Sequence, residues 1–298
     1  METDDFRESD NVVDRRGSSG GFRRVGGIGL GTIALLFGVS YVTGINPLTL
    51  IGGYEAIERG GGSTSSQTSP LDSQAQASEK FVRQILGSTE DTWSAYFAAA
   101  GGPPYRAPKL VLFSGATTSG CGTAQTAMGP FYCPVDQTVY LDTQFFNQMR
   151  TQFNACPAGP KSACDFAFAY VIAHEIGHHV QNLLGILPKV QEAEQETDKV
   201  QGNAISVKAE LQADCFAGVW ANRTQQEFDF IQPADVKAAL QTAQAIGDDM
   251  LQRVSEGYVM PDSFTHGTSA QREYWFMSGL KNGTVQACDT FDSNTSSN

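Results

Sequence analysis

Whatever this chain folds into must accommodate the segment Tyr170–Val180, which reads YVIAHEIGHHV. Its apolar residues recur at the spacing of a helix that is buried in a protein core. His174 and His178 are four positions apart and therefore share one face of that helix. Such polar side chains are costly to bury without a strong partner. We interpret this partner as a metal ion; the alternative is a pair of hydrogen-bonded histidines beside a solvated glutamate.

The residues from His174 to His178 match the pattern H-E-x-x-H. Glu175 is rotated by about 100° from His174 on the helix, so it lies near a bound metal without having to ligate it. A carboxylate in that position can take a proton from metal-bound water. His179 lies off the face that the other two histidines share, and we predict that it is not a ligand. Gly177 would allow another backbone to approach closely.

A third ligand is expected from another element, because a catalytic zinc takes three protein ligands and leaves one position to water. The segment Glu210–Trp220 (ELQADCFAGVW) is predicted to be a helix with a buried face. Glu210 and Asp214 are four positions apart on it, so both can face the first helix. We predict one Zn²⁺ per chain, with Glu210 as a ligand and Asp214 accepting the N–H of a zinc-bound histidine. The alternative is that both are surface carboxylates.

The order H-E-x-x-H followed by E-x-x-x-D is similar to the gluzincin group of metallopeptidases. The wider sequence resembles the bacterial YpfJ-like neutral zinc metallopeptidase family, and the matching segments are Arg7–Val12, Asp14–Gly17, Gly129–Pro134, Val139–Asp142, Ala169–Gln181 and Glu210–Trp220. This resemblance implies a zincin-like metallopeptidase domain, a membrane anchor and peptide or protein substrates.

A fourth histidine, His266, lies in the segment Thr265–Arg272 (THGTSAQR). This segment is similar to the T-H-P…R segment of membrane-associated gluzincins, with Gly267 in the place of the proline. The resemblance implies that His266 donates a hydrogen bond to the oxyanion of the reaction. The alternative is a helix entry, in which Thr268 serves as an N-cap and Arg272 pairs with a carboxylate.

Residues 25–46 lack charge and include an apolar run long enough to cross a bilayer as a helix, for which about 20 residues are needed. Arginines precede this run and glutamates follow it, which predicts a signal anchor with a cytoplasmic tail at residues 1–24 and an extracytoplasmic catalytic domain, periplasmic or on the cell surface. A cleaved signal peptide is the competing interpretation. Residues 47–77 are rich in Gly, Ser and Gln and predict a flexible linker.

The catalytic domain is predicted to span residues 78–291, followed by a disordered tail at 292–298. We expect an α+β fold, mostly helical, with a small sheet. The predicted strands are 109–113 and 138–142. A helix is expected from Glu79, a second start is expected at Ser88, and further helices are predicted at 165–185, 203–225, 233–256 and 269–280.

The cysteines form an even set, and two close pairs, Cys121/Cys133 and Cys156/Cys164, lie in loops rich in Gly and Pro. This spacing favours two short disulfide-closed loops and leaves Cys215 and Cys288 as the remaining pair. Six cysteines can pair in many ways, and free thiols in a reducing compartment are the alternative. Export would supply an oxidising compartment.

The net charge of -12 argues against a nucleic-acid partner, since phosphate binding requires basic patches. We predict a membrane-anchored zinc metalloendopeptidase that uses Glu175 as general base. The alternative is a non-catalytic, zinc-stabilised binding or chaperone-like module of the envelope. A hydrolase of non-peptide amides is a third possibility, because the same water activation serves any amide.

Overall fold

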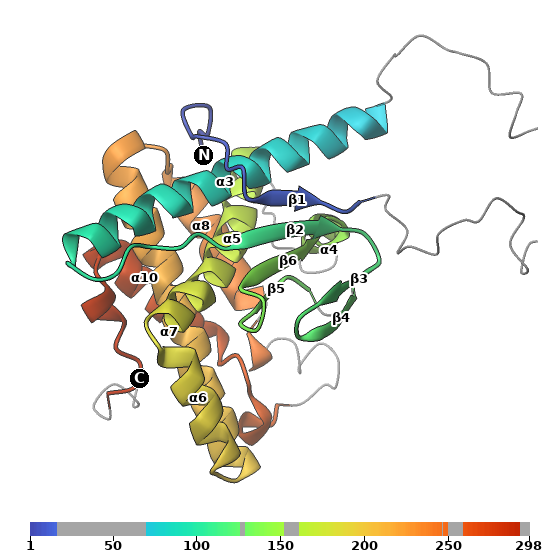
Figure 1. Ribbon diagram of the computed structural model, residues 1–298. Coiled ribbons are helices and arrows are strands. Elements are labelled where there is room, and N and C mark those ends of the chain that lie inside the picture. The colour runs from blue at the N-terminus through green and yellow to red at the C-terminus, as the bar shows by residue number, and fades with distance from the viewer. Residues whose placement is uncertain (17–69, 126–128, 152–160, 246, 250–258, 293–298) are drawn as a thin grey trace, which may run out of the picture. The chain divides into compact units, whose positions relative to one another are not determined.

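The computed structural model describes residues 1–16, 70–125, 129–151, 161–245, 247–249 and 259–292 (Figure 1). Met1–Gly17 and Gln76–Asn298 form one compact unit. This unit combines a small sheet with a larger number of helices, so the predicted α+β class is confirmed. The predicted anchor at 25–46 lies outside the described residues. Among the helices that are described, none is both long and apolar enough to cross a membrane.

The main sheet has four strands in the order β1-β2-β6-β5 (Figure 1). Its strands are β1 (Val12–Asp14), β2 (Lys109–Phe113), β6 (Thr138–Asp142) and β5 (Phe131–Cys133). The first three are parallel, and β5 runs antiparallel to β6 at the edge of the sheet. The bounds predicted for β2 and β6 are confirmed. A separate antiparallel hairpin joins β3 (Ala116–Ser119) to β4 (Gly122–Gln125).

The helices of the described residues are α3 (Pro70–Ala99), α4 (Gln144–Thr151), α5 (Lys161–Leu183), α6 (Ile186–Gln195), α7 (Lys199–Phe228), α8 (Pro233–Ala245) and α10 (Ser269–Asn282). Two short 3-10 helices, η2 (Pro261–Ser263) and η3 (Val285–Cys288), flank α10. A long helix was predicted at 233–256, whereas α8 ends at Ala245. Thr268 caps α10 in a capping box with Gln271, which fixes the start of that helix.

The prediction of a second helix start at Ser88 is wrong, because α3 runs through this position without a break. The Ser88 hydroxyl donates to the carbonyl of Ile85 and accepts the indole N–H of Trp220. The side chain therefore joins α3 to α7 instead of capping a helix. Helix α3 also begins inside the segment 47–77 that was predicted to be a linker.

The prediction of a separate tail at residues 1–24 differs from the structure, which places Met1–Gly17 in the same compact unit as the helices. Strand β1 pairs with β2. The carboxylate of Glu90 on α3 accepts hydrogen bonds from the side chains of Arg7, Ser9 and Asn11. The Met1 amine forms an ion pair of 2.7 Å with the buried carboxylate of Asp235. These partners lie far along the chain, so the local sequence shows only a polar leader.

Two of the expected disulfides, Cys121–Cys133 and Cys215–Cys288, are confirmed. The second of these ties α7 to η3 across 73 positions of sequence. Cys164 is disulfide-bonded as well, and its expected partner Cys156 lies outside the described residues. The alternative of free thiols is wrong for these five cysteines.

We expect Glu90→Gln to destabilise the fold, because Glu90 is buried and its carboxylate accepts hydrogen bonds from Arg7, Ser9 and Asn11. A hydrogen bond to a charged group contributes about 1.5–3 kcal/mol, so a loss of about 2 kcal/mol in the free energy of unfolding is expected. Urea unfolding of the full chain measures it. Glu227→Gln, at an exposed position of α7, is the matched control. Equal stability of the two variants would contradict a structural role for the N-terminal segment.

Candidate metal centre

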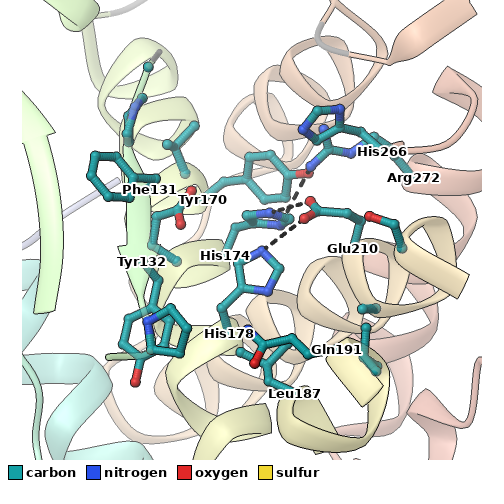
Figure 2. Close-up of a pocket in the computed structure, with 18 of the residues that line it drawn as sticks. Phe131, Tyr132, Tyr170, His174, His178, Leu187, Gln191, Glu210, His266 and Arg272 are labelled. Carbon is teal, nitrogen blue, oxygen red and sulfur yellow. Dashed lines mark hydrogen bonds and ion pairs between the residues drawn. The ribbon is translucent and has the colours of Figure 1, made fainter. Parts of the chain in front are cut away.

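Three potential ligands from two helices converge on one point. Helix α5 presents His174 and His178, and α7 presents Glu210 (Figure 2). Nε2 of His174 lies 3.2 Å from one oxygen of the Glu210 carboxylate, and Nε2 of His178 lies 3.3 Å from the other. Atoms bound at 2.0–2.1 Å to a tetrahedral zinc ion lie about 3.3 Å apart. The donor set therefore fits a tetrahedral ion in composition, and the two histidine–glutamate distances match the spacing that such an ion requires.

Close packing of α5 on α7 makes this convergence possible. A Cβ atom on Gly177 would lie 2.9 Å from the backbone oxygen of Ala213, which is closer than real Cβ contacts. A residue with a side chain would force the two helices apart. Gly177 lies one position before His178, and Ala213 lies between Glu210 and Asp214, so the contact sits within the site itself.

The other ring nitrogen of each histidine is held by an acceptor. Nδ1 of His174 donates to the carboxylate of Asp214 at 2.8 Å, and Nδ1 of His178 donates to the side-chain oxygen of Gln181 at 2.9 Å. With a metal ion bound, a proton held on Nδ1 would leave the Nε2 of each imidazole free to ligate. Sequence reasoning anticipated the acceptor Asp214 but missed Gln181.

The buried carboxylate of Asp214 connects three helices. It accepts two hydrogen bonds from the guanidinium of Arg272 on α10, at 2.8 and 2.9 Å, and one from the hydroxyl of Tyr170 on α5. Burial raises the pKa of Asp214, but the charges of Arg272 and His174 prevail and hold it at about 2. Asp214 is therefore ionised and able to orient His174. Sequence reasoning left the partner of Arg272 open and did not single out Tyr170.

The two glutamates of the site differ in their surroundings. Glu210 has a pKa well below its ordinary value despite its burial, because His178 and His174 face it. It is an anion, as a metal ligand must be. Glu175 is also buried, and burial raises its pKa. It lines the same cavity as the cluster without belonging to it. This is the environment of a group that exchanges protons.

His179 points away from the cluster, in keeping with its prediction as a non-ligand. Its Nε2–H donates to the carbonyl of Arg106 at 2.6 Å, and its Nδ1 accepts from the hydroxyl of Tyr132 at 3.0 Å. Burial lowers the pKa of His179 to about 4, so the ring is neutral. Its role is to join α5 to the sheet, since Tyr132 belongs to β5.

A cavity of about 560 Å³ opens over the cluster. Figure 2 shows Phe131 and Tyr132 on one side of the two metal-facing histidines and His266 and Arg272 on the other. His266 lies on the loop before α10, and it lines the cavity together with Glu175 and Glu210. Apolar side chains make up much of the remaining wall, namely Pro130, Phe131, Pro134, Phe145, Val171, Leu187 and Val190.

The fold and the site together define a class: an α+β domain with a candidate metal centre made of two histidines on one helix and a glutamate on a second. The chain belongs to the family described as "Putative neutral zinc metallopeptidase", whose model matches residues 1–291. Zinc is accordingly the metal that the family implies for the cluster of His174, His178 and Glu210.

Two bacterial relatives match the chain over long stretches. The chain is 46% identical to the uncharacterized protein YpfJ of Escherichia coli K12 over 298 residues, which cover 96% of each chain. It is also 46% identical to the uncharacterized protein Rv2575 of Mycobacterium tuberculosis H37Rv over 199 residues, which cover 63% of this chain and 64% of the relative. No solved structure matches the chain.

We expect Asp214→Asn to weaken zinc binding by about 10- to 100-fold, because the variant removes the anion that orients His174. Zinc affinity measured by competition with a chelating dye tests this. Glu227→Gln on the same helix should bind zinc as the wild type does. Circular dichroism of the metal-free variant separates lost affinity from lost folding, since Arg272 also loses its charged partner. Unchanged zinc affinity in a folded Asp214→Asn protein would contradict the orienting role.

Proposed function

We propose that the protein is a zinc-dependent endopeptidase in which His174, His178 and Glu210 hold the metal and Glu175 is the general base. The convergence of the three ligands beside a buried glutamate that lines the same cavity carries this proposal. Zinc, when bound, supplies a Lewis acid that polarises the scissile carbonyl and acidifies a water molecule. A structural zinc site would need the ligands but would have no use for Glu175.

Residues of the chain carry out the proton transfers and donate a hydrogen bond to the substrate. Glu175 takes a proton from the attacking water and passes it to the leaving nitrogen. Its raised pKa suits both transfers, because a carboxyl group that is too acidic would not keep the proton. His266, on the opposite side of the cavity from β5, donates a hydrogen bond to the oxygen of the carbonyl under attack.

The edge of the sheet provides a place for an extended substrate. An extended peptide can bind to a protein by adding a strand to an exposed sheet edge. Strand β6 is flanked by β2 and β5, so it has no free edge. Among the described strands, β5 has β6 on one side only, and its residues Phe131 and Tyr132 line the cavity. A peptide that pairs with β5 would pass over the metal-facing histidines.

The side chains that line the cavity determine which substrate residues it can accommodate. Apolar side chains from β5, α5 and α6 line it, including Phe131, Val171 and Leu187. Cleavage next to large apolar residues is therefore the preference that we propose.

Glu175→Gln should lower the rate of peptide cleavage by about 10²- to 10⁴-fold, because the amide cannot take the water proton. Cleavage of a mixed peptide library by the zinc-loaded full chain, analysed by mass spectrometry, measures this. The variant should bind as much zinc as the wild type, since Glu175 is not part of the ligand cluster. A chelator should abolish the wild-type activity, and added zinc should restore it.

The outcomes distinguish the candidate functions. Cleavage at the normal rate by Glu175→Gln would contradict the mechanism. A folded, zinc-loaded wild-type protein that cleaves no peptide would favour the non-catalytic binding module. Cleavage restricted to small amides that are not peptides would favour the amide hydrolase.

Membrane attachment through residues 25–46 remains a proposal, and the sheet constrains its geometry. A single crossing by this segment would place residues 1–24 and 78–291 on opposite sides of the membrane. Strand β1 is hydrogen-bonded to β2 in the same sheet, and a bilayer cannot lie between two paired strands. We therefore propose that residues 1–16 and the metal centre lie on the same side of the membrane, in place of the single crossing suggested by the sequence.

Cysteine labelling tests this arrangement. Asp10 and Asp292 are exposed positions near the two ends of the described chain, and each is replaced by cysteine in turn. We expect a membrane-impermeant maleimide to label both positions or neither in intact spheroplasts, and to label both after lysis. Opposite labelling of Asp10→Cys and Asp292→Cys would establish a single crossing and exclude the β1–β2 pairing in cells. The wild-type chain, whose described cysteines are all disulfide-bonded, serves as the background control.

A further inference from the structure

The loop that carries His266 is held by a carboxylate that follows α8. Asp248 is buried, with 8% of its surface exposed. One oxygen of its carboxylate accepts the backbone N–H groups of Thr265, His266 and Gly267 at 2.7, 2.6 and 3.1 Å. The backbone N–H of Asp248 donates in return to the carbonyl of Gly267 at 3.0 Å. Four hydrogen bonds thus join one residue to three consecutive residues of the loop.

The second oxygen of the Asp248 carboxylate faces the His266 ring. It lies 3.2 Å from Nδ1 of His266, and the hydroxyl of Thr265 lies 3.0 Å from the same nitrogen. Among the described residues, Nε2 of His266 has no hydrogen-bond partner, and the residue lines the cavity over the metal-facing histidines. The carboxylate thus occupies one ring nitrogen and leaves the other available to a substrate.

Gly267 is required for this arrangement. Its φ of 90° lies in a region that side chains disfavour, and its N–H is one of the three that Asp248 accepts. Proline has neither this φ nor an N–H to donate. The glycine that stands in place of the proline of the similar T-H-P segment is therefore part of how this chain holds its histidine.

We propose that Asp248 is a positioning residue, which clamps the turn at Thr265–Gly267 and aims Nε2 of His266 at the substrate carbonyl. This rests on the proposed function, in which His266 donates to that oxygen. Asp248 itself does not line the cavity, so it acts only through His266.

The hydrogen bond that His266 donates to the substrate depends on pH. Asp248 raises the pKa of His266, burial opposes this, Glu210 on α7 raises it further and Arg272 on α10 lowers it. With the raised pKa, the ring is protonated below that pKa, so both nitrogens donate, and the charged donor is lost as the pH rises through it. The contribution of His266 to catalysis therefore falls on the alkaline side.

Asp248→Asn separates two roles of the carboxylate, namely holding the loop backbone and contacting Nδ1 of His266. The side-chain oxygen of asparagine can still accept the three backbone N–H groups, so the loop should keep its conformation. The amide N–H then faces the Nδ1–H of the protonated His266 ring, where a donor meets a donor. The variant should lower the pKa of His266 and shift the alkaline limb of kcat/KM to lower pH, so that kcat/KM falls by about 10- to 100-fold in the pH interval between the variant's limb and the wild-type limb.

Asp249→Asn is the matched control. The neighbouring carboxylate of Asp249 accepts from the N–H and hydroxyl of Ser269 at the start of α10 and does not contact His266. The asparagine oxygen can accept the same hydrogen bonds, so the alkaline limb should stay where it is in the wild type.

A double-mutant cycle tests whether Asp248 acts through His266. We expect Asp248→Asn to have no further effect on kcat/KM in a His266→Gln background. An equal loss in both backgrounds would overturn the proposal and leave Asp248 with a structural role only. An alkaline limb that Asp248→Asn does not move would overturn it as well.

A second measurement does not depend on activity. The chain has only four histidines, so the ring signals of His266 can be assigned in a ¹⁵N NMR titration by their loss in His266→Gln. We expect Asp248→Asn to lower the His266 pKa, and an unchanged pKa would overturn the proposal. A lowered pKa in a protein that cleaves no peptide would support the positioning by Asp248 while contradicting the peptidase function.

Discussion

The buried carboxylate of Asp214 is the interaction on which the arrangement of the site depends. An isolated buried anion is expensive, so the fold must bring it partners. They come from two further helices: Tyr170 and His174 from α5 and Arg272 from α10. Removing one partner of such a buried ion pair typically lowers the free energy of unfolding by about 3–5 kcal/mol. The contact that orients His174 thus also fixes how three helices meet, and the position of this ring cannot change without disturbing the packing.

Two pairs of site residues could be predicted from the sequence because their geometry is local. Residues four positions apart share a helix face whatever the tertiary structure, so the pairs His174/His178 and Glu210/Asp214 followed from spacing alone. The pairing of Arg272 with Asp214 spans 58 positions, and no local pattern specifies it. Strands β2 and β6 were predicted for a similar reason, since each contains a short run of apolar, aromatic or β-branched residues, which suits a buried strand.

The N-terminal segment shows the opposite case. Its residues are polar and charged, which is typical of a solvated tail, yet Ser9 and Glu90 are buried and bonded to each other across 81 positions. Only the tertiary structure reveals that this polar leader matches a set of partners on α3. The same holds for Asp248, whose importance depends on a loop that reaches it 17 to 19 positions later in the chain.

The N-terminal strand also decides which edge of the sheet stays free. Without β1, strand β2 would present an unpaired row of N–H and C=O groups, which invites pairing with other chains. Strand β1 covers that row and is itself only three residues long, too short to be an effective template. The opposite edge, β5, lies against the cavity. Under the proposed function, a peptide that adds a strand to the sheet would bind at the edge that shares a cavity with His174, His178 and Glu175.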